Sequence, residues 1–201
     1  MGRVSQAQAR ENRERIVATA AGLFRERGIA GVSVADISAA AGLTHGGFYK
    51  QFESKDALVT EAIGYAFAEQ AARLTAGLGS GRDESDAGPR SAGAAEARDG
   101  LDDAERRALL DAYLSIGHRD EPAVGCPTAG FAGDVARAAG GEAARHAYAA
   151  GVEAYARLLG TDGEADLAAV STMVGALILA RATAGTGLSE RILTEARAAL
   201  S

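Results

Sequence analysis

The chain has 201 residues, a length that suits either one domain or a small domain joined to a larger one. Hydrophobic residues make up 47% of it and charged residues 24%, which excludes a disordered chain. Alanine is abundant, aromatic residues reach only 5% and there are three prolines. Because alanine has the highest helix propensity and strands favour β-branched and aromatic residues, the composition predicts an all-α protein.

The net charge of −6 divides unevenly along the sequence. Residues 1–55 hold eight Lys and Arg against five acidic residues, a net of +3, whereas residues 56–201 hold 13 against 22, a net of −9. A basic head on an acidic body would confine attraction for phosphate to one end of the molecule. Chance variation of surface charge is the alternative explanation.

The sequence predicts neither a secretory signal nor a membrane-spanning helix. The first residues carry no apolar run, which predicts no signal peptide. The most apolar stretch, 173–180, is far shorter than the roughly 20 residues of a membrane helix, so no membrane partner is expected. A single cysteine, Cys126, excludes an internal disulfide and suits a reducing compartment. We therefore predict a cytoplasmic protein.

Two helices are predicted near the start of the chain. The first spans about residues 6–27 and ends at Gly28. Its apolar positions fall on one stripe: Ile16, Val17, Ala20, Leu23 and Phe24. Ser33 and Asp36 form a Ser-x-x-acid capping pattern that opens a short second helix.

Gly42 then predicts a tight turn, because glycine tolerates the left-handed backbone that such a turn requires. Thr44 caps a third helix that runs to about Phe52, and Ser54 caps a fourth. This succession is the layout of a helix-turn-helix. We assign residues 1–55 to a three-helix DNA-binding domain and 56–201 to a larger helical domain, for which the family resemblance described below implies effector binding and dimerisation.

Residues 79–100 are rich in Gly, Ser and charge, and are predicted to form a flexible loop. Further helices are expected at about 101–116, 125–139, 142–159 and 164–184. A last helix, capped by Ser189, should run to the C-terminus.

The third helix carries the strongest sign of function. Phe48 and Phe52 mark its buried side, so Gly46, Gly47 and Lys50 lie on the opposite side. Two adjacent glycines cost roughly 1 kcal/mol each against alanine, yet they let a helix approach another surface closely. A major groove is such a surface. A frayed first turn on an ordinary surface helix is the alternative interpretation.

Polar residues that suit DNA surround these glycines. Thr44 and His45 lie at the N-terminal end, where recognition helices read bases, and Tyr49 can donate to a phosphate. Lys50 and Lys55 are the only lysines of the chain. Lys55 opens the fourth helix, where an ammonium and free backbone N–H groups together can bind a phosphate.

The residues from 15 to 62 resemble the DNA-binding domain of the TetR/AcrR family of regulators. The matching motifs are A-x-x-L-F in the first helix, G-x-x-x-x-S-V-x-D-I before the second, A-G-L-T-x-G-x-F-Y-x-x-F in the third, and S-K-D-A-L. The resemblance implies groove and phosphate contacts from a set of residues on the second, third and fourth helices: Ser33, Thr44, His45, Gly46, Tyr49, Lys50 and Lys55. Val34 and Ala35 stand where some members place a base-reading arginine, so specificity should depend on the third helix.

The segment Gly125–Ala139, which contains Gly-Cys-Pro, resembles the LmrA/YxaF-like subgroup of the same family. The family implies a homodimer formed by the last two long helices. An apolar stripe permits it: Leu167, Val170, Val174, Leu177, Ile178 and Arg181, beside the small Gly175 and Ala176. Burial of this stripe within one chain is the alternative.

A pocket for an unidentified small-molecule effector is assigned to the body. Its candidate residues are Tyr113, Cys126, Phe131, Tyr148, Tyr155 and Met173, each of which would otherwise be core. Cys126 is either a sensor or a small buried hydrophobe. His118, Asp120 and Glu121 lack paired ligand spacing, so neither a metal site nor a cofactor is expected.

These features predict a ligand-responsive repressor that binds a palindromic operator in double-stranded DNA. An enzyme that uses Cys126 and a histidine is one alternative, but the sequence shows no nucleophile–base–orienter set and no phosphate loop. A protein-interaction module that retains a helix-turn-helix is the other.

Overall fold

The computed structural model describes residues 6–80, 100–161 and 164–201, with the backbone alone at 75–80. Every regular element within these ranges is helical, as the composition predicts. The elements are α1 (Gln6–Arg27), α2 (Val34–Ala40), α3 (His45–Phe48), α4 (Lys55–Ser80), α5 (Asp103–Tyr113), α6 (Ile116–Asp120), the 3₁₀ turn η2 (Pro122–Val124), α7 (Pro127–Ala136), α8 (Gly141–Leu159), α9 (Leu167–Ala182) and α10 (Gly187–Leu200).

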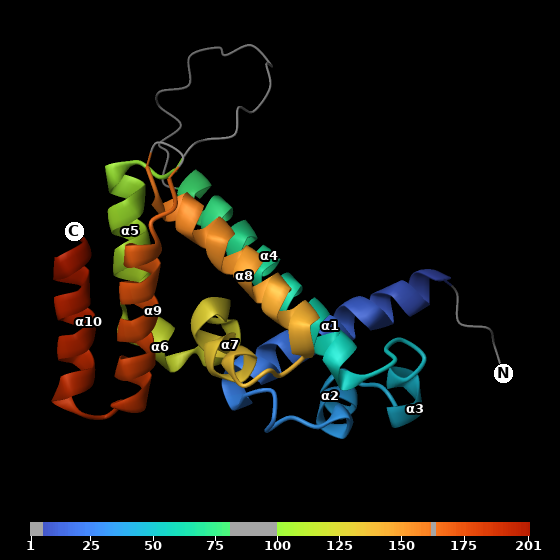
Figure 1. Cartoon of the computed structure of the whole chain (residues 1–201). Coiled ribbons are helices and arrows are strands. Elements are labelled where there is room, and N and C mark those ends of the chain that lie inside the picture. Colours follow the sequence, from blue (N-terminus) through green and yellow to red (C-terminus); the bar gives the residue numbers. More distant parts are fainter. Residues whose placement is uncertain (1–5, 81–99, 162–163) are drawn as a thin grey trace, which may run out of the picture.

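The first four helices pack around one hydrophobic core at one end of the molecule (Figure 1). Phe24 of α1, Ile37 of α2 and Phe48 of α3 are all fully buried in it. The first half of α4 supplies Leu58 and Ile63 to the same core. α7 and α8 also contribute, through Phe131, Val135 and Ala144. The head therefore shares its core with the body.

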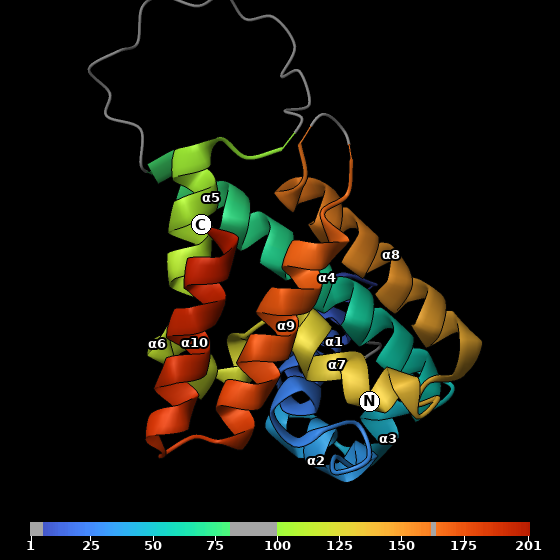
Figure 2. The same ribbon diagram turned by 60° about the vertical axis from the view of Figure 1, so that its left-hand side comes forward.

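A second core holds the body together. α5, α8, α9 and α10 pack around it, with Leu110, Leu159 and Leu177 at its centre. α4 and α8 run side by side along much of their length, and α9 and α10 form a hairpin at the edge of the molecule (Figures 1 and 2). The long α4 thus reaches from the head into the body and contributes to both.

The helix boundaries predicted from the sequence agree with the structure in most places. α3 is shorter than predicted: the helix has four residues, and residues 49–51 continue as a turn in which the amide of Phe52 donates to the carbonyl of Phe48. α6 and η2 were not predicted as separate elements. The greater part of the predicted loop at 79–100 lies outside the described residues, and α4 extends through Ser80.

The predicted cap of the last helix is wrong. Ser189 lies inside α10, whose N-cap position is Thr186, and its side chain is fully buried. Its hydroxyl donates to the carbonyl of Ala180 at 2.7 Å and accepts from the Arg119 guanidinium at 2.9 Å. The hydroxyl therefore ties α10 to α9 and α6 instead of capping its own helix.

None of the helices searched in the described part of the chain has both the length and the apolar character that crossing a membrane requires.

Candidate nucleic-acid interface and ligand cavity

The helix-turn-helix is held in shape by two side-chain caps. The Ser33 hydroxyl accepts from the amide of Asp36, whose carboxylate accepts from the amide of Ser33, so the predicted capping box is present. The Ser33 hydroxyl and, with a smaller effect, the Ser33 amide donate to the Asp36 carboxylate and lower its pKa. The Thr44 hydroxyl accepts from the amide of Gly47 at 3.2 Å. Gly42 has a φ of +68°, the conformation that the predicted turn between α2 and α3 demands.

α3 presents one polar face to solvent. Phe48 and Phe52 are buried beneath it, while Thr44, His45, Gly46 and Lys50 are exposed. A Cβ added at Gly46 would meet no atom within 4 Å, so nothing inside the protein requires glycine there.

Aromatic contacts organise this face. Tyr49 is 55% exposed, and its ring lies edge-on to His45 and Phe48, with centroids 5.3 and 5.2 Å apart. Because these contacts hold the Tyr49 ring in place, its hydroxyl can bind a phosphate at little cost in conformational entropy.

Arg13 of α1 fixes the end of this segment. Its guanidinium lies 4.1 Å from the centroid of the Phe52 ring and donates to the carbonyl of Gln51 and to Glu61 of α4. The face that carries the predicted contacts is thus attached to both long helices of the head.

The two lysines of this segment differ in environment. Lys50 is exposed, and the described residues offer its ammonium no partner. Lys55 is half-buried: its ammonium donates to the carbonyl of Ile29 and lies 5.8 Å from the centroid of the Phe24 ring. An ammonium has three N–H donors. Lys55 can therefore bind a phosphate while it donates to the carbonyl of Ile29 in the loop between α1 and α2.

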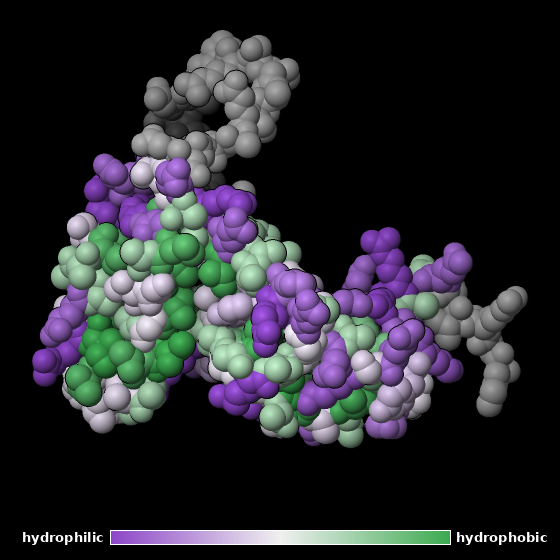
Figure 3. All heavy atoms as spheres, in the orientation of Figure 1, coloured by the Kyte–Doolittle hydropathy of each residue, from purple (hydrophilic) through white to green (hydrophobic). Residues whose placement is uncertain are grey.

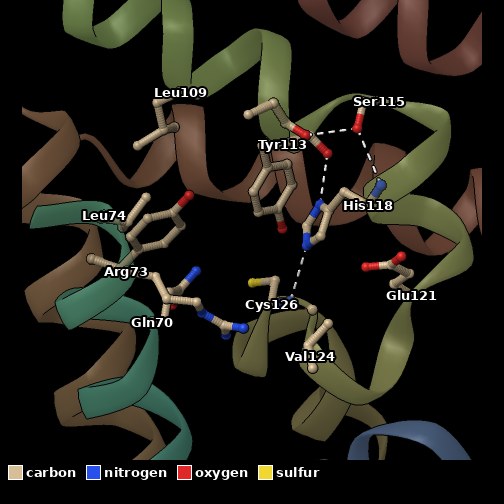
Figure 4. Close-up of a pocket in the computed structure, with 13 residues that line it drawn as sticks. Gln70, Arg73, Leu74, Leu109, Tyr113, Ser115, His118, Glu121, Val124 and Cys126 are labelled. Atoms are coloured by element: carbon tan, nitrogen blue, oxygen red, sulfur yellow. Dashed lines mark hydrogen bonds between the residues drawn. The ribbon is translucent and has the colours of Figure 1, made fainter. Parts of the chain in front are cut away.

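A cavity of about 330 Å³ opens in the body between α4, α5, α6 and the segment before α7 (Figure 4). Tyr113, Cys126 and Tyr155 of the predicted pocket line it. Phe131 and Met173 do not line it and are instead fully buried, Phe131 in the core of the head and Met173 in that of the body.

Tyr148 also lies outside the cavity. It is half-buried against Phe67, with centroids 5.9 Å apart, and its hydroxyl donates to the carbonyl of Thr128 at 2.8 Å. Burial, with a smaller effect from Cys126, raises the pKa of Tyr148 to about 12. Its polar atom is therefore already satisfied within the protein.

His118 was not predicted as a pocket residue. Its Nδ1 lies 2.7 Å from the carbonyl oxygen of Tyr113, and its Nε2 accepts from the amide of Cys126 at 3.1 Å. Burial lowers the pKa of His118, with a further lowering from Arg181 and Arg73. A neutral ring that donates through Nδ1 satisfies both bonds, so His118 fixes the wall of the cavity.

Comparisons with known proteins bear on both parts of the molecule. A family model described as "Bacterial regulatory proteins, tetR family" matches residues 16–62, which include the whole helix-turn-helix. A crystal structure of a TetR transcriptional regulator from Chloroflexus aurantiacus J-10-FL is 28% identical and superposes with a TM-score of 0.67 over 97% of this chain and 94% of that one. Residues 16–62 therefore match the TetR family of bacterial regulatory proteins, and the whole chain has the fold of a TetR regulator.

Other relatives agree with this assignment. The "Uncharacterized HTH-type transcriptional regulator YerO" of Bacillus subtilis (strain 168) is 38% identical over 55 residues, which are 27% of this chain and 19% of that protein. The reduced form of E. coli NemR shares the fold at 21% identity, with a TM-score of 0.68 over 95% of each chain. The family model does not reach residues 125–139, so the LmrA/YxaF-like resemblance stays a prediction. The TetR family consists of regulators and not enzymes, as the sequence predicted.

The TetR-type head is joined to the cavity by a buried arginine. Arg25 of α1 is 6% exposed, and its guanidinium donates to the carbonyl of Gly125 at 3.1 Å and to Glu69 of α4 at 3.0 Å. Gly125 lines the cavity, and the adjacent Cys126 is held by His118. A second link joins α7 to the head, where the Asp134 carboxylate accepts from the amide of Ile29 at 2.9 Å. Sequence periodicity places Arg25 on the buried side of α1 but cannot show the partners of either link.

Within the described residues, no group of three or more His, Cys, Asp or Glu side chains is arranged to hold a metal ion.

Proposed function

We propose that the protein is a DNA-binding transcriptional repressor that acts as a homodimer on a palindromic operator and is released by a small molecule. The observation that carries the DNA-binding part is the exposed face of α3. No packing contact within the protein requires a glycine at position 46. On this face Gly46 is surrounded by His45, Tyr49 and Lys50. Such a face lets the backbone approach base edges while its flanking donors bind phosphates. This role is exercised on the chromosome, so we expect the protein in the cytoplasm.

We assign the DNA contacts by position. Thr44, His45 and Gly46 lie at the N-terminal end of α3, where base edges are read in helix-turn-helix proteins. Tyr49, Lys50 and Lys55 would bind phosphates, and Ser33 would do so at the start of α2 with a hydroxyl that already bonds Asp36. His45 is the candidate for sequence preference.

The homodimer would form through α9 and α10. An apolar surface covers these two helices (Figure 3). The two helices carry four large apolar residues that are between 41% and 56% exposed: Leu167, Ile178, Leu179 and Leu188. Val170 and Leu177 of the predicted stripe are buried within the chain instead. Two copies related by a two-fold axis would cover the remaining apolar side chains and present two α3 helices to successive major grooves.

Ligand response would use the cavity in the body. A molecule in it contacts the segment whose Gly125 carbonyl binds Arg25 of the head. Only a ligand that prefers one arrangement of this contact can change the affinity for DNA.

A pair of glycine variants tests the DNA-binding surface. Gly46→Ala places a methyl group on the exposed face of α3, and Gly64→Ala places one on an exposed position of α4; neither Cβ meets an atom within 4 Å. Both variants should fold as well as the unchanged protein. We expect Gly46→Ala to weaken binding to the intergenic DNA beside its own gene at least tenfold, measured by fluorescence anisotropy, and Gly64→Ala to leave it unchanged.

The salt dependence completes this test. Binding through phosphates should weaken steeply as salt rises, because counterions are released from the DNA. Equal binding by the two glycine variants, or affinity that does not depend on salt, would contradict the proposed interface and favour the protein-interaction module.

A further inference from the structure

Two tyrosines in the wall of the cavity carry hydroxyls that the protein leaves without strong hydrogen-bond partners. The Tyr113 and Tyr155 rings are stacked, with centroids 6.4 Å apart and planes 29° from parallel. Both hydroxyls are buried; within the described residues that of Tyr155 has no hydrogen-bond partner, and that of Tyr113 has only the weak Cys126 thiol beside it. An unsatisfied buried hydroxyl costs about 1–3 kcal/mol, so such groups call for an explanation.

These hydroxyls are suited to donate. Burial raises the pKa of Tyr113 and of Tyr155 well above the usual value, and the nearby Cys126 thiol adds to the effect in both. Both phenols are therefore protonated at neutral pH. Tyr113 extends between His118 and Cys126 (Figure 4), and both nitrogens of His118 are already occupied by the backbone. An acceptor atom on a ligand would satisfy what the protein does not.

The charges around the cavity favour a negative ligand. Arg73 and Gln70 extend from α4 on one side, and Glu121 comes from the opposite side (Figure 4). Arg73 shares its carboxylate partner: Glu69 lies 3.5 Å from Arg73 but 3.0 Å from the buried Arg25. Two guanidinium groups thus compete for one carboxylate.

The other charged groups near the cavity do not reverse this balance. Arg181 donates to the carbonyls of His118 and Arg119, which carry no neutralising charge. Arg73 and Glu121 are both exposed, so solvent screens both charges, whereas Arg181 is half-buried and bonded to the carbonyl of His118 in the cavity wall. Arg73 and Glu121 thus offset one another at the cavity, and the half-buried Arg181 beside His118 leaves the balance positive.

The remaining wall is apolar and the space is small. Leu74, Leu109 and Val124 line it with the tyrosine rings. A volume of about 330 Å³ lies at the lower end of the range of small-molecule pockets.

We propose that the effector is a small organic acid with an apolar body, whose negative group pairs with Arg73 and accepts hydrogen bonds from Tyr113 and Tyr155. This proposal rests on the proposed function, since it names the ligand to which the repressor responds. An acid that pairs with Arg73 competes with Glu69 for that guanidinium, and Glu69 is the carboxylate that also binds Arg25 of the head. The ligand therefore acts on a contact shared with α1.

The first test measures binding to the full chain in the absence of DNA. Isothermal titration compares 3-phenylpropanoate, hexanoate and benzoate with the alcohol and the amine of the same carbon skeleton. We expect at least one acid to bind ten times more tightly than its alcohol and its amine. Tighter binding of the amines would show a cation site governed by Glu121. That result, equal binding within each set, or no binding of any acid would overturn the proposal.

The second test separates ligand binding from stability. Tyr155→Phe removes a hydroxyl that has no partner, so Tm should stay the same or rise while the affinity for the acid falls about tenfold. Tyr148→Phe is the matched control: it loses the bond to Thr128, so Tm should fall while affinity is unchanged. Unchanged affinity in Tyr155→Phe, or equal losses in both variants, would overturn the assignment.

Arg73 provides the charge control. Arg73→Gln should abolish the preference for the acid over its alcohol, and Arg73→Lys should retain it; a preference that survives in Arg73→Gln refutes the ion pair. Because these titrations contain no DNA, their outcome is independent of operator binding. A chain that binds acids but no DNA would refute the proposed function alone, and a chain that binds DNA but no acid would refute this inference alone.

Discussion

Replacing Arg25 by methionine should destabilise the protein by about 3 kcal/mol. The Arg25 side chain is 2% exposed and makes three contacts: with the carbonyls of Ala21 and Gly125, and with Glu69. Removing one partner of a buried ion pair costs about 3–5 kcal/mol. The lower end applies here because Glu69 is 29% exposed and retains Arg73 at 3.5 Å. Methionine fills much of the same volume, so the loss measures the polar contacts and not a cavity.

Urea denaturation at one fixed protein concentration measures this loss, since unfolding of an oligomer depends on concentration. Arg27→Met is the control, because Arg27 is 55% exposed in its side chain and, among the described residues, forms an ion pair with the exposed Glu26 alone. The control should lose less than about 0.5 kcal/mol. A loss below about 1 kcal/mol in Arg25→Met, or losses that do not differ between the two variants, would show that the link between head and body contributes little.

Three further predictions concern separate contacts. Asp134→Ala leaves the amide of Ile29 without its acceptor and should cost about 1–3 kcal/mol in urea denaturation; a smaller loss would show that water replaces the carboxylate. Burial lowers the pKa of His118, so the unfolded chain binds protons more readily and the free energy of unfolding should decline as pH falls below about 6.5. His118→Phe should decline less between pH 7.5 and 5.5, and parallel declines would refute the effect. Ile178→Glu should convert dimers to monomers in sedimentation experiments. Tyr65→Glu, at a similarly exposed position of α4, should not. If the Ile178→Glu variant remains a dimer, the α9 face is not the dimer interface.

The helices were predictable where local patterns determine them. The apolar stripe of α1 and the capping residues Ser33 and Thr44 act within a few residues of one another, and the structure places all three as expected. Ser189 was misassigned because a serine near a helix start resembles a cap whether its hydroxyl bonds its own helix or another one. α6 and η2 are too short for periodicity to show, and Pro122 interrupts the pattern between them.

The ligand cavity was predictable only in part. Tyr113 and Cys126 were found because aromatic and small apolar residues commonly line pockets, but the same rule selected the core residues Phe131 and Met173. A sharper signal was present on α4: Gln70 follows Ala66 by four residues on the buried stripe, where a polar side chain is out of place. Arg25, four residues after the buried Ala21, gives the same signal on α1. The partners of these groups lie too far along the chain for any local pattern to show them.

The core of the head extends into α7 and α8, and this limits how the protein could be re-engineered. Phe131, Val135 and Ala144 fill space among the side chains of the first four helices, and Asp134 binds the loop that follows α1. A graft of residues 1–55 onto a foreign sensor would leave that space empty and that amide unbonded. A working chimera must carry the first half of α4 and a compatible α7 with the head, so the interchangeable unit of this protein is not a continuous stretch of its sequence.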